Sequence, residues 1–79
     1  MDLSKYQSED IFNVLHELNR IHNACMKGIE KGSKAELDYW DEFISEIKAA
    51  HINLEYMRRK KIDADLNKVA NEEIRRNMF

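Results

Sequence analysis

The segment from Ala35 to Lys61 constrains the fold most, because its apolar residues occupy a broad arc of a helix. At about 100° per residue, two adjacent stripes together cover roughly 160° of the helix surface. The first stripe consists of Leu37, Trp40, Ile44, Ile47, His51 and Leu54, and the second of Tyr39, Phe43, Ala50 and Met57. One flat contact needs an arc of only about 100°. We therefore expect this helix to contact two neighbours.

A second amphipathic segment precedes this helix. Its apolar residues recur at helical spacing on one side: Ile11, Val14, Leu15, Leu18, Ile21, His22, Cys25, Met26 and Ile29. Ser4 with Gln7 has the spacing of a capping box, and Ser8 offers a second start. Gly32 suits the left-handed residue that ends a helix. These signals predict a helix over about residues 5–31.

The connection between the two helices is predicted to be very short. Ser33 and Glu36 have the S-x-x-E spacing of a capping box, directly after the glycine stop. A turn at Lys31–Lys34 forces the helices, about 5–31 and 33–60, into an antiparallel hairpin in which residues at equal height sum to about 64. In this hairpin we expect the first stripe of the second helix, including Ile47, to pack on Leu18 and its neighbours. The second stripe is then left for another contact.

The chain after Met57 allows two arrangements. A bend near Lys60–Asp63, with Asp63 as N-cap, would let a C-terminal helix over about 63–77 fold back onto the second stripe. Alternatively, one helix runs from Ser33 to about Asn77, since no glycine or proline interrupts it. We favour the bend, because a small domain gains most by closing its own core. The predicted fold is all-α: a single domain over residues 1–79, a small helical bundle that either the third helix or oligomerisation completes.

Composition and cysteine count narrow the class of protein. The chain has 79 residues, 35% of them charged and 43% hydrophobic, with one cysteine. An intrachain disulfide is therefore excluded. The apolar runs are far shorter than the ~20 residues that a membrane-spanning helix needs, and the first residues lack the apolar core of a signal peptide. We expect a cytoplasmic protein without a membrane partner.

The residues that could bind a metal are predicted to lie too far apart. His22 and Cys25 share one face of the first helix, and His51 lies on the second. In the predicted hairpin, His51 is level with Phe12, roughly 15 Å along the axis from His22. Zinc ligands must lie within about 2.3 Å of one ion. No phosphate-binding loop, nucleophile–base pair or inward carboxylate pair is visible, so we expect no metal, cofactor or catalytic residue.

Aromatic residues and a methionine on the two stripes suggest a protein contact. Tyr39, Trp40, Phe43 and Met57 are of the residue types that dominate interface hot spots. The sequence favours a non-enzymatic protein–protein interaction module, homo-oligomeric and acting by surface occlusion as an adaptor, inhibitor or assembly factor. Its partner would be another protein, a second copy, or both.

The alternative is a small nucleic-acid-binding regulator. Its phosphate contacts would come from the basic C-terminal segment, which contains Arg58, Arg59, Lys60, Lys61, Lys68, Arg75 and Arg76. Two features weigh against it. Four successive residues on a helix point in four directions, and Lys61, Asp65 and Lys68 alternate in sign at ion-pair spacing.

Overall fold

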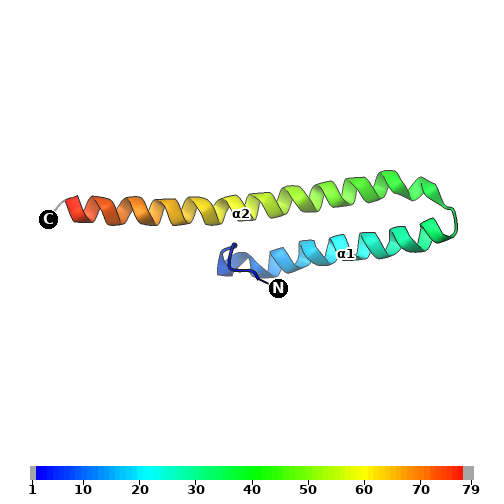
Figure 1. The fold of residues 1–79 in the computed structure, drawn as a ribbon, viewed down its shortest axis with the longest axis horizontal. Helices are drawn as coiled ribbons and strands as arrows, with labels where there is room; N and C mark the ends of the chain where they lie inside the picture. Colours follow the sequence, from blue (N-terminus) through cyan, green and yellow to red (C-terminus); the bar gives the residue numbers. More distant parts are fainter. Residues whose placement is uncertain (1, 78–79) are drawn as a thin grey trace.

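Two antiparallel helices make up almost all of the regular structure (Figure 1). The structure, a computed structural model, describes residues 2–77 and the side chains of residues 2–71. Helix α1 spans Ile11–Ser33 and α2 spans Trp40–Asn77. Each follows a single 3-10 turn, η1 at Ser8–Asp10 and η2 at Leu37–Tyr39. The described residues contain no strand, so the prediction of an all-α chain with two packed helices is confirmed.

The predicted bend at Lys60–Asp63 is wrong. Helix α2 continues without interruption through these residues, and residues 63–77 form its second half, not a separate helix that folds back. Two ion pairs hold the segment in helical geometry: Lys61 Nζ lies 3.1 Å from Asp65 Oδ1 one turn on, and Lys60 Nζ lies 3.1 Å from Asp10 Oδ1 of η1. Without glycine or proline, nothing in the backbone opposes continuation.

The turn between the helices begins later and is longer than predicted. Helix α1 passes through Gly32 and ends at Ser33, and Ala35 takes the left-handed conformation, with φ of 57°. The amides of Ala35 and Glu36 donate to the carbonyl oxygens of Gly32 and Lys31, at 3.0 and 2.9 Å. This is a Schellman motif with alanine at the position that usually holds glycine.

The two predicted capping boxes do not form. Ser33 Oγ instead donates to the carbonyl oxygen of Glu30, at 2.7 Å, so it belongs to the end of α1. The N-caps of η1 and η2 are Gln7 and Glu36, and neither makes a side-chain capping bond. Because residues 34–39 are not part of either long helix, α2 starts at Trp40 and not at Ser33.

The longer turn shifts the register of the hairpin. The cross-helix pairs Asp10–Lys60 and Glu17–Asn53 each have residue numbers that sum to 70, compared with the predicted 64. The start of α1 is therefore level with Arg59, and residues 60–77, here called the α2 extension, continue beyond α1, with Lys60 still paired to Asp10 of η1 (Figure 1). The molecule measures 69 × 21 × 14 Å, and its radius of gyration is 18.8 Å. A compact domain of this length would have about 12 Å.

The contact between the helices follows a heptad-like seam, with residues spaced alternately by three and four. The seam contains Asp10, Val14, Glu17, Ile21, Ala24 and Gly28 before the turn, and Tyr39, Phe43, Glu46, Ala50, Asn53, Met57 and Lys60 after it. Val14 and Ala50 have no exposed surface. Phe43 packs over Gly28, where an added Cβ would lie 3.5 Å from Phe43 Cδ2, an ordinary van der Waals contact.

The expected roles of the two stripes on α2 are reversed. The second stripe, with Tyr39, Ala50 and Met57, faces α1, and the first stripe, with Trp40 and Ile44, lies beside the contact. Small residues explain the choice, because Ala24, Gly28 and Ala50 let the helix axes approach closely. The seam also places polar groups opposite suitable partners, as at Glu17 and Asn53.

Candidate interaction surface

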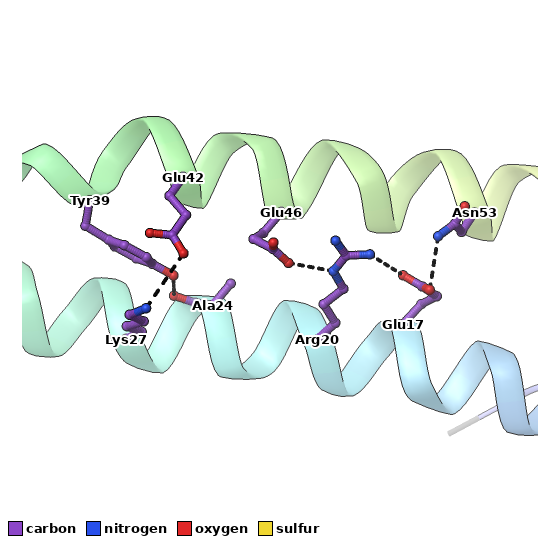
Figure 2. A network of polar contacts seen from close by, with 8 residues as sticks. All are labelled: Glu17, Arg20, Ala24, Lys27, Tyr39, Glu42, Glu46 and Asn53. Atoms are coloured by element: carbon purple, nitrogen blue, oxygen red, sulfur yellow. Dashed lines mark hydrogen bonds and ion pairs between the residues drawn. The ribbon is translucent and has the colours of Figure 1, made fainter.

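One broad side of the hairpin is closed by polar contacts between the helices (Figure 2). Arg20 Nε donates to Glu46 Oε2 at 2.6 Å, and Arg20 Nη1 lies 3.7 Å from Glu17 Oε2. Asn53 Nδ2 donates to Glu17 Oε1 at 3.0 Å. Towards the turn, Lys27 Nζ lies 3.8 Å from Glu42 Oε1 and 4.9 Å from the centre of the Tyr39 ring. We call this side the polar face; its charged groups pair with one another, and only Glu17 Oε2 among the atoms named here is buried without a hydrogen bond.

The ion pair at the centre of the polar face changes the acidity of its members. The hydrogen bond from Arg20 lowers the pKa of Glu46 below its ordinary value. The same bond raises the pKa of Arg20. At the far end of the seam, the hydrogen bond to Asp10 raises the pKa of Lys60. These shifts favour the charged forms of Arg20, Glu46 and Lys60, and both contacts join α2 to the part of the chain before the turn in one register.

Several side chains of the basic run after Met57 make contacts within the chain. Arg58 Nη1 donates to the carbonyl oxygen of Lys5 at 2.8 Å, Lys60 pairs with Asp10, and Lys61 pairs with Asp65. Arg59 and Lys68 are exposed. The side chains of Arg75 and Arg76 lie outside the described residues. Of the predicted phosphate-binding residues that the structure describes, three thus have acidic or carbonyl partners within the chain.

The opposite side of the hairpin carries large apolar side chains that the chain does not cover. This apolar face consists of Leu15, Met26 and Ile29 of α1, Trp40 and Ile44 of α2, and Ile62, Leu66 and Val69 of the α2 extension. All eight have more than 40% of their surface exposed, and Ile29 and Leu66 more than 60%. At about 100° per residue the α2 members fall within one third of its circumference. His51 and Glu55 are exposed between Ile44 and Ile62, so the apolar residues of α2 form one group near the turn and a second group on the α2 extension.

Two hollows interrupt the apolar face where the helices meet. The first, of about 450 Å³, lies near the turn and is lined by Cys25, Gly28, Ile29, Gly32, Trp40 and Phe43. The indole of Trp40 meets the Phe43 ring edge-on, with centroids 5.3 Å apart, and forms one wall. The second, of about 390 Å³, lies between the segment before η1 and α2 and is lined by Tyr6, His51, Leu54, Glu55, Arg58, Arg59 and Ile62. The first hollow is therefore mainly apolar, whereas charged and polar side chains line most of the second.

The structure divides the four residues predicted to form an interface. Tyr39 and Met57 are buried in the seam, so they stabilise the hairpin and are not available to a partner. Tyr39 Oη also donates to the carbonyl oxygen of Ala24, at 3.4 Å. Trp40 and Phe43 line the hollow near the turn. The remaining surface residues, Leu15, Ile29 and Ile44 among them, were assigned to the hairpin core by sequence reasoning.

The residues considered for a metal site do not converge. His22, Cys25 and His51 are each exposed. Among the described residues, no group of three or more His, Cys, Asp or Glu side chains is placed to hold a metal ion. Within the same residues, neither α1 nor α2 combines the length and apolar character needed to cross a lipid bilayer.

One signal in the sequence could have identified the seam. Positions 39, 43, 46, 50, 53, 57 and 60 repeat at alternating intervals of four and three, and so do positions 10, 14, 17, 21, 24 and 28. Read in opposite directions, the two series pair an acid with a base at Asp10–Lys60.

Comparisons of this chain with protein families, with curated proteins and with solved structures find no match.

Proposed function

We propose that this protein is a non-enzymatic interaction module, which binds a protein chain through its apolar face and acts by occluding a surface of that partner. The observation that carries the proposal is the separation of the two sides of the hairpin. Charged groups on the polar face are paired within the chain, whereas Ile29, Trp40 and Ile44 remain exposed beside a hollow of about 450 Å³. Burying apolar surface is the main favourable term in most protein associations.

The hollow near the turn is surrounded by aromatic and aliphatic side chains, so it is suited to hold an anchoring side chain of a partner. Trp40 is of the residue type most enriched at interface hot spots, and it already packs against Phe43, so little side-chain freedom remains to be lost on binding. Lys27 and Glu42 on the polar face pair with each other and offer no comparable anchor. The apolar face is therefore the proposed binding side.

A pair of neighbouring substitutions tests this function. Ile44→Asp places a charge on the apolar face, and Ser45→Asp places the same charge one position further round α2, on an exposed site. Proteins captured by the immobilised wild type are purified, and their affinities for the three forms are measured by calorimetry. We expect Ile44→Asp to weaken binding at least about tenfold, or 1.4 kcal/mol, and Ser45→Asp to leave it unchanged. Equal affinities for all three forms would refute the proposal.

A further inference from the structure

We propose that the α2 extension of one chain docks, antiparallel, on the apolar face of a second copy, and that the second copy reciprocates. This rests on the proposed function, because it names the chain itself as one occupant of the same face. Each half of such a dimer is a three-helix bundle, made of one hairpin and the extension of the other copy. The α2 extension of one copy thereby supplies the third helix that packs on the hairpin of the other copy.

The lengths of the two parts of α2 match. The part paired with α1, residues 40–59, is about 30 Å long, and the α2 extension, residues 60–77, is about 27 Å long. A two-fold axis near residues 58–59 lays each extension along the paired part of the other α2. Neither extension then projects beyond the assembly, and neither apolar face is left uncovered.

The apolar residues of the α2 extension continue the face that they would cover. Ile62, Leu66 and Val69 lie on the same side of α2 as Ile44, away from the seam. They are all more than 40% exposed. An isologous contact requires the same surface on both copies to be self-complementary. On α2 the exposed apolar residues form two groups on one side, Trp40 and Ile44 in the hairpin and Ile62, Leu66 and Val69 in the extension, with His51 and Glu55 exposed between them. In the proposed dimer the second group of each copy packs on the hairpin of the other.

The surface area favours an occupant of this size. The chain exposes 6503 Å², whereas a compact monomer of its mass would expose about 5000 Å². A stable association buries about 800 Å² on each partner. The excess of about 1500 Å² is therefore large enough for the reciprocal contact, which covers both the extension and the apolar face of every copy.

Charged residues lie close to the two-fold axis. Glu55 and Arg59 line the same hollow, one turn apart on α2. An axis at residues 58–59 places Arg59 of each copy level with Arg58 of the other, and Glu55 of that copy lies three residues, or about 4.5 Å, away in height. Two Arg59–Glu55 ion pairs of this kind would offset the repulsion between the arginines and help to align the copies.

The first experiment is sedimentation equilibrium of the full chain between 1 and 200 μM. We expect a dimer for the wild type, at least a hundredfold weaker dimerisation for Leu66→Asp, and no change for Asn67→Asp. Asn67 is exposed on another side of the extension, so it controls for the added charge. Circular dichroism checks that the hairpin stays folded, since both positions lie outside it. A wild type that is monomeric at 200 μM, or a dimer that Leu66→Asp leaves intact, would overturn the docking.

A cross-link tests the antiparallel register. Cys25 is level with residue 45 of its own α2, about 36 Å along the axis from position 69, so the two positions cannot be bridged within one chain by a short bismaleimide. Across the proposed dimer they lie about three residues apart in height. We expect Val69→Cys to yield a covalent dimer with such a reagent through Cys25, and Val69→Cys combined with Cys25→Ser to yield none at this linkage. Absence of the Cys25 linkage in a sedimenting dimer would exclude this geometry.

These outcomes separate the two proposals. If the wild type is monomeric while Ile44→Asp abolishes binding of another purified protein, the interaction function stands and the self-docking is wrong. If Leu66→Asp dissociates a dimer but no other chain binds the apolar face, self-association alone is supported.

Discussion

The two sides of this hairpin use the same pair of helices in opposite ways. On the polar face, Arg20 pairs with Glu46 and Glu17 accepts a hydrogen bond from Asn53 across the seam, so the polar groups of this side are bound to one another within one chain. On the apolar face, Ile29 and Ile44 have no such cover among the described residues and stay mostly exposed. The comparison shows that the pairing of α1 and α2 is determined by small residues and polar register. Several of the largest apolar side chains, among them Ile29 and Ile44, remain outside this pairing.

The largest expected effect breaks the seam and leaves the apolar face intact. Ala50 is fully buried between the helices, so Ala50→Asp should cost at least about 3 kcal/mol, the typical loss when an unpaired charge is buried. A domain of this size has only about 3–5 kcal/mol of stability, so we expect the hairpin to unfold. Urea unfolding followed by circular dichroism measures the loss.

The same charge introduced on the apolar face should change the stability of the monomer far less. Ile44→Asp, on an exposed site of the same helix, should alter the stability of the monomer by less than about 0.5 kcal/mol. At the low concentrations where association is absent, unfolding midpoints of Ile44→Asp and wild type should coincide. If Ile44→Asp were as damaging as Ala50→Asp, the first stripe of α2 would be core and the two faces would have been assigned in reverse.

A smaller change in stability, in the stabilising direction, is expected at the turn, which determines which faces of α1 and α2 meet. Ala35 has φ of 57° at the end of a Schellman motif, a conformation that costs an L-residue roughly 1–2 kcal/mol. Ala35→Gly should therefore stabilise the hairpin by about 1 kcal/mol, less the extra backbone entropy of glycine in the unfolded chain. Thermal unfolding is the measurement. A control, Ala49→Gly within α2, should destabilise by a similar amount.

The pH dependence of stability tests whether the polar face is closed as described. The pKa of Glu46 is lowered in the folded state by the hydrogen bond from Arg20. Its contribution is therefore fully present above the unfolded pKa of about 4.3 and is lost as the pH falls through the lower folded value. We expect the difference in melting temperature between wild type and Glu46→Gln to shrink below about pH 4. A difference that stays constant from pH 7 to pH 3 would contradict the ion pair.

The same reasoning places a second, smaller change at high pH. The pKa of Lys60 is raised by its hydrogen bond to Asp10. Its contribution is present below the unfolded pKa of Lys and disappears as the pH rises through the raised folded value. Lys60→Gln should abolish this alkaline component and leave the acid component unchanged.

The smallest effect is expected for nucleic acid. Arg58, Lys60 and Lys61 already have partners within the chain, so few phosphates can be neutralised. We expect random duplex DNA to bind weakly, with a log–log salt slope shallower than about −2, where each phosphate contact contributes about −0.9. A slope of about −4 or steeper would instead support the alternative of a nucleic-acid-binding regulator, and Arg59→Ala and Lys68→Ala should then reduce it.

Periodicity in the sequence was sufficient to predict the class of the fold. The 3.6-residue spacing of apolar residues predicted helices before and after position 32, joined by a short turn, with no strand. It also predicted that the helix after the turn has too broad an apolar arc for one contact, and the exposure of Ile44 beside the buried Ala50 agrees. These features are local, because they depend only on which residues share a side of one helix.

The choice between two adjacent stripes was decided by tertiary structure. Both stripes of α2 are apolar, so periodicity alone cannot rank them. Close approach at Gly28 and Ala50 and the bond between Arg20 and Glu46, 26 residues apart in sequence, determine which one faces α1. The register depends in turn on Ala35, whose left-handed conformation no propensity would have predicted. Whether α2 bends or continues depends on tertiary contacts in the same way. Bending would close a core within one chain, whereas the unbroken helix keeps ion pairs such as Lys60–Asp10, which form only when the two parts of the chain are in contact.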